Sequence, residues 1–305
     1  MATKHIPKPP TSTLMQKFQK EIWNFYKSNK RDLPWRNTTD PYHILVSEVM
    51  LQQTQVIRVI PKYQEFIKKF PTIKKLAQAS KAEVLTLWQG LGYNRRALFL
   101  KKACETLYAQ NPKNPQFPIS REELLKLPGI GQSTAGAVLA FAFNKPIPFI
   151  ETNIRAVFLY FFFKDSSSVS DITILELVQQ SLNQKKQREN PREWYYALYD
   201  YGSMLKTKLG KDKKTELHKQ SKHYNKQSTF KGSNREIRST ILKLFTLTKN
   251  IKKQRHIHKR SIIEEILKNL PQANPENIQT NLKSLVKEGF LQEVEGGLSY
   301  TLDVV

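Results

Sequence analysis

Leu127-Pro128-Gly129-Ile130-Gly131, followed by Gln-Ser-Thr-Ala-Gly to residue 136, joins two apolar runs that have helical spacing. The Pro-Gly-x-Gly order favours a sharp turn, because glycine adopts positive φ angles that other residues avoid. Such a turn leaves unpaired backbone N–H groups at the start of the next helix, where the helix dipole also favours an anion. The sequence therefore predicts either a turn that only separates two helices or a backbone clamp for phosphate. The clamp would be formed by Gly129, Gly131, Ser133 and Thr134.

On both sides of this turn, from Leu14 to about residue 221, the chain is a succession of amphipathic segments. Phe18, Ile22 and Tyr26, for example, recur at the spacing of one helical face. Prolines interrupt the apolar runs repeatedly, and there is no sustained alternation of apolar and polar residues. We therefore expect a mostly α fold of many short helices, preceded by a flexible lead-in at residues 1–13.

Residues 234–305 have a different pattern. Three apolar helical stripes are followed by two short runs, residues 290–294 and 298–302, which are joined through Gly296-Gly297. A glycine pair between two such runs is typical of a hairpin turn. Three helices followed by a hairpin resemble a winged helix. We therefore expect a small, separate winged-helix-like α/β unit that binds DNA or protein, or that serves only as a packing module.

Composition and charge narrow the class of partner. The 305 residues fit two domains or at most three. The sequence has 50 Lys and Arg against 26 Asp and Glu, so its formal net charge is +24, which favours nucleic acid or an anionic membrane surface. No apolar run approaches the roughly 18–20 residues of a membrane span. Because the start of the chain also lacks the pattern of a secretory signal, we expect a cytoplasmic protein.

Cysteine and lysine usage add two expectations. The single cysteine, Cys104, excludes within this chain a disulfide framework, a four-cysteine zinc site and a four-cysteine iron–sulfur cluster, so no metal and no cofactor is expected. From residue 206 onward, lysines follow one another with little acid between them. This run is either a solvated linker, assigned to residues 222–233, or a groove that follows phosphates, with Lys222 and Lys226 as contacts.

Two acids lie in settings that suit chemistry. Glu48 is surrounded by apolar residues that should be buried, so a raised pKa and a role as proton donor are expected, unless the carboxylate pairs with an arginine or backbone amides. Glu151 follows an apolar run and by default caps the next helix. Alternatively, its carboxylate faces the sugar of a strand whose phosphate the turn holds. Gln52 and Gln53 are neutral groups suited to base edges, or have no special role.

These elements occur in the order of a known family. Residues 14–221 resemble the MutY adenine DNA glycosylases of the helix-hairpin-helix superfamily. The most specific match is the Ser-Glu-Val-Met-Leu-Gln-Gln-Thr-Gln-Val run at residues 47–56. The resemblance implies two all-α lobes, one of which contains the hairpin. It is carried, in chain order, by Leu33-Pro34-Trp35-Arg36, residues 47–56, Trp88-Gln89-Gly90-Leu91-Gly92-Tyr93, Leu127-Pro128-Gly129-Ile130-Gly131 and Ser133-Thr134-Ala135-Gly136-Ala137.

The resemblance also implies roles. Glu48 matches the general acid and base, which protonates N7 of a flipped-out adenine and then activates water. Glu151 matches an aspartate that stabilises the sugar cation. Ser133 stands where lyase-active relatives carry a nucleophilic lysine, which implies hydrolysis without strand cleavage. Base or mismatch recognition is assigned to Gln52, Gln53, Tyr93 and Asn153.

The sequence departs from the family in four ways. Glu151 replaces the aspartate, and Asn94 stands where many relatives have a second tyrosine. The four cysteines that most members carry after the segment matching residues 197–202 are absent, and the lysine-rich segment occupies their place. The final unit is too short, and its predicted elements are in the wrong order, for the Nudix-like domain that reads 8-oxoguanine.

We therefore expect a monofunctional glycosylase that removes adenine opposite G or 8-oxoguanine in base excision repair. Its expected partner is double-stranded DNA with a mismatched or damaged pair; no membrane is expected, and the chain is expected to act as a monomer. Two alternatives remain open. One is a mismatch thymine or uracil glycosylase of the same fold, and the other is a catalytically silent DNA-binding protein.

Overall fold

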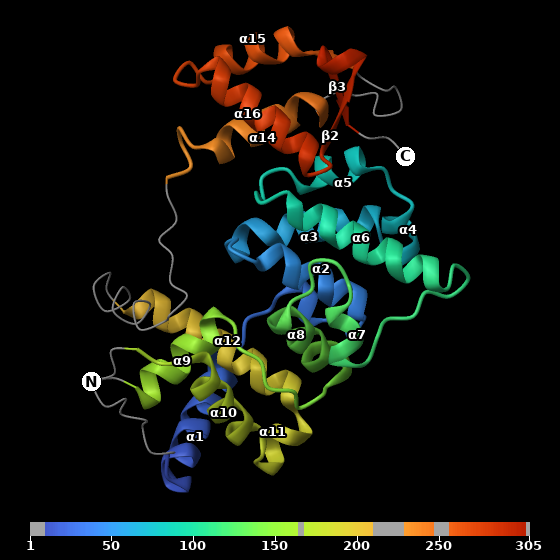
Figure 1. Ribbon diagram of the computed structural model, residues 1–305. Helices are drawn as coiled ribbons and strands as arrows, with labels where there is room; N and C mark the ends of the chain where they lie inside the picture. Colours follow the sequence, from blue (N-terminus) through green and yellow to red (C-terminus); the bar gives the residue numbers. More distant parts are fainter. Residues whose placement is uncertain (1–9, 164–167, 210–228, 247–255, 303–305) are drawn as a thin grey trace, which may run out of the picture. The chain divides into compact units, whose positions relative to one another are not determined.

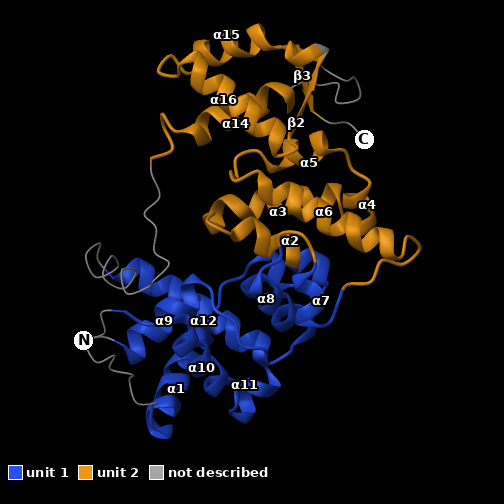
Figure 2. Cartoon of the chain, viewed as in Figure 1, with its two compact units in different colours: residues 1–44, 118–126, 130–226 blue, residues 45–117, 127–129, 227–305 orange. Residues whose placement is uncertain are grey.

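The computed structural model describes residues 10–163, 168–209, 229–246 and 256–302, and these are mostly helical (Figure 1). The expected mostly α class is therefore confirmed. The chain forms two compact units (Figure 2). Unit 1 contains residues 1–44, 118–126 and 130–226, and unit 2 contains residues 45–117, 127–129 and 227–305. Within the described ranges, no helix is both long enough and apolar enough to cross a bilayer.

The core of unit 1 contains large aromatic side chains from three helices. Phe18 packs against Phe158 and Trp194, with ring centroids 5.2 Å and 5.7 Å away, and all three residues are buried. Aromatic pairs in such tilted and edge-to-face arrangements add to the stability gained by burial. The helices of unit 1 are α1 (Ser12–Asn29), α7 (Arg121–Leu125), α8 (Gln132–Phe143), α9 (Thr152–Phe162), α10 (Asp171–Leu182), α11 (Lys185–Glu189) and α12 (Pro191–Lys208), with a 3₁₀ turn at Pro34–Arg36.

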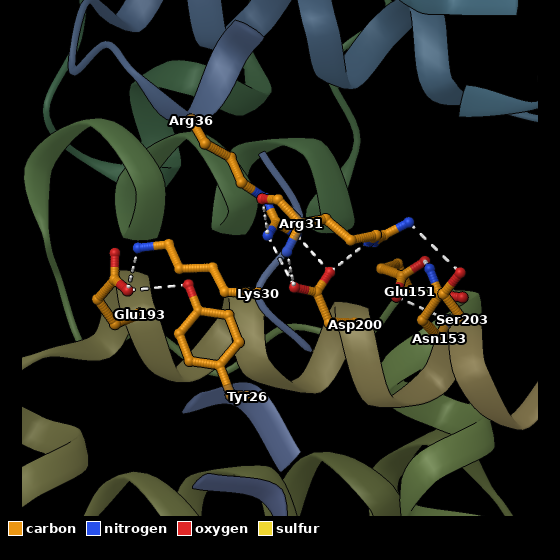
Figure 3. Close-up of polar contacts among 9 residues, drawn as sticks. All are labelled: Tyr26, Lys30, Arg31, Arg36, Glu151, Asn153, Glu193, Asp200 and Ser203. Carbon is orange, nitrogen blue, oxygen red and sulfur yellow. Dashed lines mark hydrogen bonds and ion pairs between the residues drawn. The ribbon is translucent and has the colours of Figure 1, made fainter. Parts of the chain in front are cut away.

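An arginine pair joins the N-terminal segment of unit 1 to α12 (Figure 3). Arg36 donates to both carboxylate oxygens of Asp200 at 2.7 Å and 2.8 Å, and its guanidinium lies 4.4 Å from the centre of the Tyr196 ring. Arg31 donates to the same carboxylate through its Nε and its backbone N–H. Because Asp200 is buried, removing either arginine leaves part of its charge uncompensated. The Leu-Pro-Trp-Arg motif thus fixes the start of the chain onto α12.

Unit 2 begins with a group of helices around Phe66 and Trp88, whose side chains are fully buried. One of these helices, α2, starts in the part of the chain assigned to unit 1 and ends in unit 2. Ser80 and Glu83 form a capping box at the start of another, which satisfies two backbone N–H groups reciprocally. These helices are α2 (Pro41–Leu51), α3 (Val56–Lys69), α4 (Ile73–Ala77), α5 (Lys81–Trp88) and α6 (Arg95–Gln110).

The C-terminal part of unit 2 has three helices and a three-stranded antiparallel sheet in the order β1-β3-β2. The three expected helices and the final hairpin are present, and the turn between the last two strands has Gly296 and Gly297 at φ angles of 65° and 86°. The likeness to a winged helix stays a prediction. Glu288 joins this part to α6, because it pairs with Arg95 at 2.9 Å and with Arg238 at 2.7 Å. The elements are α14 (Asn234–Thr246), β1 (Ile257–His258), α15 (Lys259–Asn269), α16 (Pro275–Lys287), β2 (Leu291–Val294) and β3 (Ser299–Leu302).

Two expectations about element bounds are wrong in detail. Helix α1 begins at Ser12, inside the expected flexible lead-in, because Thr11 Oγ1 accepts the N–H of Leu14 and caps the helix. The strand β1 was not expected at all. It has two residues, too few to produce an alternating pattern in the sequence.

Candidate functional site

The turn between α7 and α8 has the geometry that its glycines predict. Gly129 has a φ of +76°, and a Cβ there would lie 2.6 Å from the Cβ of Phe99 in α6, so no other residue fits without displacement. Gly131 is the N-cap of α8, and a Cβ there would meet no atom within 4 Å. Since Gly131 brings no side-chain acceptor, the first-turn N–H groups of α8 are presented as an anion-binding helix start.

Two residues of the predicted clamp lie just inside α8. Ser133 is half-buried in the first turn, and Thr134 is buried. Further along the helix, Gly136 allows the chain before α9 to pass close by, because a Cβ there would lie 2.4 Å from the Cβ of Phe149. This close passage fixes residues 149–151 against α8. Helix α8 and the acid at residue 151 are therefore held together within unit 1.

Glu151 caps α9, as the default interpretation of the sequence predicts. Its Oε1 accepts the backbone N–H groups of Asn153 at 2.6 Å and Ile154 at 2.9 Å, and its Oε2 accepts Nδ2 of Asn153 at 3.2 Å (Figure 3). Burial is the largest effect and leaves the pKa of the Glu151 carboxyl above its ordinary value, although the charge of Lys206 and these three hydrogen bonds lower it. The carboxylate is thus fixed in one orientation by donors that favour its ionised form.

Asn153, which the sequence assigns to base recognition, lies beside this carboxylate. The close approach of α12 depends on Gly202, because a Cβ there would lie 2.6 Å from both the Cβ and the carbonyl oxygen of Asn153. The structure therefore brings Glu151 and Asn153 together, and it places α12 directly against the start of α9. Base recognition by Asn153 stays a prediction.

Glu48 lies in the last turns of α2. Its neighbours Ser47 and Val49 are buried, whereas Glu48 itself is half-buried. Asp40 caps the helix, since its Oδ1 accepts the N–H of Tyr42 at 2.8 Å. Glu48 belongs to unit 2 and Glu151 to unit 1. The raised pKa expected for Glu48 stays a prediction.

Arg96 organises the loop that carries the predicted recognition residues. Its Nη1 donates to the carbonyl oxygens of Val49 and Gln52, each at 2.7 Å, and to that of Met50 at 3.1 Å. Its Nη2 donates to Thr54 Oγ1 at 3.2 Å and, among others, to the carbonyl of Gly92 at 2.8 Å. Burial lowers the pKa of Arg96 to about 10, so the group stays charged at neutral pH.

The contacts of Arg96 join the end of the helix that bears Glu48 to the Gly90–Tyr93 turn. Gln53 and Tyr93, one on each side, have φ angles of 53° and 49°, a left-handed conformation that costs a non-glycine residue roughly 1–2 kcal/mol. Gln52, Gln53 and Tyr93 are exposed. Strained, exposed residues on an over-determined loop are typical of a binding site. Sequence reasoning missed Arg96, because no local pattern distinguishes it from the neighbouring Arg95.

Two further expectations concern the lysine-rich segment and the iron–sulfur cluster. Lys222 and Lys226, the predicted phosphate contacts, lie outside the described residues. The iron–sulfur cluster common in similar proteins requires cysteine thiolates, and the single cysteine of the sequence, Cys104, is buried in α6. The residues of this chain therefore do not fit such a cluster.

Residues 46–184 match the family model for an HhH-GPD superfamily base excision DNA repair protein. This stretch contains the hairpin turn, Glu48 and Glu151, and it is similar to the domains of that superfamily. Several proteins of similar sequence are adenine DNA glycosylases. The chain is 37% identical over 189 residues to that of Buchnera aphidicola subsp. Baizongia pistaciae, which covers 62% of this chain and 52% of the relative. It is 39% identical over 153 residues to that of Mycobacterium tuberculosis, which covers half of each chain.

A mouse adenine DNA glycosylase is 38% identical over 152 residues, 46% of this chain and 28% of the relative. The chain thus spans about half or less of the length of these curated relatives. Among solved structures, a thermostable thymine-DNA glycosylase has a TM-score of 0.57 at 25% identity and covers 70% of this chain and 97% of its own. The H. pylori 3-methyladenine DNA glycosylase shares the fold, with a TM-score of 0.51 at 18% identity over 65% of this chain and 99% of its own.

Proposed function

We propose that this protein is a monofunctional DNA glycosylase that hydrolyses the bond between deoxyribose and a mispaired adenine. The observation that carries the proposal is the Glu151 carboxylate, which is oriented by two backbone N–H groups and the Asn153 amide immediately after the hairpin. A fixed anion is the group needed beside a sugar that becomes cationic as its base departs. The similarity to adenine DNA glycosylases from bacteria and mouse supports adenine as the base.

In the proposed reaction, Glu48 and Glu151 have different protonation states. Glu48 donates its proton to N7 of the extruded adenine, which makes the base a better leaving group, and the C1′–N9 bond breaks. Glu151 remains ionised and stabilises the resulting sugar cation. Glu48, now a carboxylate, takes a proton from water as the water oxygen bonds to C1′. The products are free adenine and an abasic site.

The DNA contacts of the proposal are divided between backbone and base. The first turn of α8, opened by Gly131, holds a phosphate, and the exposed Gln52, Gln53 and Tyr93 enter or contact the mismatch. Adenine must leave the duplex before it reacts, which costs a few kcal/mol and requires a side chain to fill the vacated space. Tyr93 suits this role because its half-exposed ring is held by a fixed turn.

The test is base release from a panel of duplexes at stoichiometric enzyme, followed by alkali to cleave abasic sites. We expect cleavage of strands with adenine opposite G or 8-oxoguanine. Without alkali the strand should remain intact, because Ser133 replaces the lysine of lyase-active relatives. Absence of any abasic product from the adenine duplexes contradicts the proposal.

A second candidate is a thymine or uracil mismatch glycosylase, which is favoured by the similarity to the thymine-DNA glycosylase structure. T:G and U:G duplexes in the same panel separate the two activities. A third, a silent DNA-binding protein, predicts salt-sensitive binding to every duplex and release of no base. Glu48→Gln separates this candidate from the glycosylases. The substitution should abolish base release by an enzyme, and it should change nothing measurable in a silent DNA-binding protein.

A further inference from the structure

Lys206 lies in the last turn of α12 and reaches back to the start of α9. Its Nζ donates to Oδ1 of Asn153 at 2.6 Å, and the residue is half-buried. Gly202 precedes it by four residues and therefore lies on the same face of the helix. Because Gly202 lets α12 approach the Asn153 backbone so closely, the lysine side chain reaches an amide that a more distant helix would not bring within its range.

Asn153 uses both ends of its amide. Its Oδ1 accepts from Lys206, and its Nδ2 donates to Oε2 of Glu151 at 3.2 Å. The lysine thus orients the amide so that the NH₂ group faces the carboxylate, since a flipped amide would oppose oxygen to oxygen. One side chain thereby controls the geometry of the next, and the contact ends at the carboxylate that the proposed reaction needs.

The charge of Lys206 acts on the same carboxylate. Burial raises the pKa of Glu151, and the positive charge of Lys206 lowers it. Two other charges on the packed helices have ion-pair partners elsewhere. Arg155 of α9 pairs with Asp171 of α10 at 2.6 Å, and Asp200 of α12 is paired with Arg31 and Arg36. Lys206 is the cation that the structure directs toward Glu151.

We propose that Lys206 is a positioning residue that holds the Glu151 carboxylate oriented and ionised, through the Asn153 amide and through its own charge. The inference rests on the proposed glycosylase function. It gives a role to the first cation of the lysine-rich segment, a role distinct from contact with DNA phosphates. Lys208, two residues later and exposed, lacks any such position and provides a matched control.

The experiment compares Lys206→Met, Lys206→Gln and Lys206→Arg with Lys208→Met, all as the full chain. Single-turnover release of adenine is measured from pH 5 to 9 at saturating enzyme, so that weaker DNA binding does not affect the rate. We expect Lys206→Met to lower the rate about 10- to 100-fold, the effect of losing a hydrogen bond to a charged group. Its acidic limb should move to higher pH, because the rate requires ionised Glu151 and loss of the cation raises that pKa.

The conservative variants separate the two effects. Lys206→Arg keeps the charge and a donor, so it should keep the position of the acidic limb. Lys206→Gln is an uncharged donor, so it should show the displaced limb even if it orients Asn153. Lys208→Met should match the original protein. An unmoved acidic limb in Lys206→Met, or an equal effect in Lys208→Met, overturns the proposal.

A second readout is independent of activity. The pKa of Glu151 is measured in the free protein by ¹³C NMR of the carboxyl groups, with Glu151→Gln to assign the resonance. We expect a higher pKa in Lys206→Met than in the original protein. If no duplex releases a base, the proposed function fails, yet this titration still tests Lys206. An unchanged Glu151 pKa refutes the role of Lys206 whatever the enzyme activity.

Discussion

Glu151 combines a structural and a proposed chemical task in one carboxylate. As N-cap of α9 it satisfies two backbone N–H groups that would otherwise lack a partner. The same donors fix the negative charge beside the hairpin. Aspartate is also a favoured N-cap, but its shorter side chain ends one bond closer to the backbone. Glu151 reaches the N–H groups of α9 with a side chain one bond longer than that of the aspartate implied by the family resemblance.

Two substitutions test the hypothesis that the charge of Glu151 takes part in the reaction. Glu151→Asp should retain base release within about tenfold, because the charge and the cap remain, although a displacement near 1 Å has a cost. Glu151→Gln should lower the rate by about 100- to 1,000-fold, the effect of removing one fixed electrostatic group at a reacting centre. Single-turnover rates on the duplex with adenine opposite 8-oxoguanine give both values. Equal rates for Gln and Glu at this position would show that the charge has no part in the reaction.

Arg96 has a comparable place in unit 2, with donors to two turns at once. Arg96→Met should lower the free energy of unfolding by about 2–4 kcal/mol, because partly buried carbonyl groups lose a charged donor. Arg96→Lys should recover only part of this loss, since an ammonium group cannot reproduce the fork of the guanidinium. Urea denaturation measures both. A loss under about 0.5 kcal/mol, the range of an ordinary surface substitution, would contradict the assignment.

At the level of secondary structure, the two glycines of the hairpin turn have different tasks. Gly129 allows the close approach of Phe99, and Gly131 leaves the first N–H groups of α8 open to an anion. Gly129→Ala should destabilise the fold by about 1–3 kcal/mol, because it combines a positive φ with overlap against Phe99. Gly131→Ala is the matched control, since its φ of −97° and open surroundings accept a methyl group. Thermal unfolding compares the two. Equal stability of both variants is incompatible with the described turn.

Much of the secondary structure can be predicted from the sequence. Helical stripes, the Pro-Gly-x-Gly turn and the glycine pair at Gly296 depend on local chemistry, and each is present in the structure as predicted. The Glu151 cap follows from the same local rules. What local patterns do not contain are contacts between distant segments. The Arg36–Asp200 pair spans 164 residues, and the Lys206–Asn153 contact spans 53.

Arginine and lysine are hard to assign from sequence because most of them are solvated. Arg96 lies between Arg95, which pairs with Glu288, and Ala97, which is buried. No local pattern distinguishes Arg96 from its neighbour, yet it connects the end of α2 with the Gly90–Tyr93 turn. Only the folded chain identifies it.

At the scale of the whole molecule, the positive charge is unevenly distributed along the chain. Residues 234–305 contain twelve Lys or Arg and eight Asp or Glu, a net of +4 out of the total of +24. Most of the excess therefore lies in residues before this C-terminal part. This distribution favours packing or protein contact over phosphate contact for the winged-helix-like elements.

A salt titration of DNA binding tests this distribution. Each neutralised phosphate contributes about −0.9 to the slope of log K against log salt concentration. Replacing Lys283 and Lys287, both exposed on α16, by glutamine should leave the slope unchanged, because neither side chain is expected to contact phosphate. Fluorescence anisotropy with a labelled duplex measures it. A slope that becomes shallower by about two units would place α16 on the DNA backbone.

We propose that a proton on Glu48 and the charge on Glu151 both act on the nucleotide that loses its base. This is tested by single-turnover release of adenine from a duplex with 8-oxoguanine opposite, with the original protein and Glu48→Gln compared at stoichiometric enzyme. We expect alkali-labile product with the original protein and almost none with Glu48→Gln, although both bind the duplex equally. Equal product from the two proteins, or none from either, contradicts the proposal.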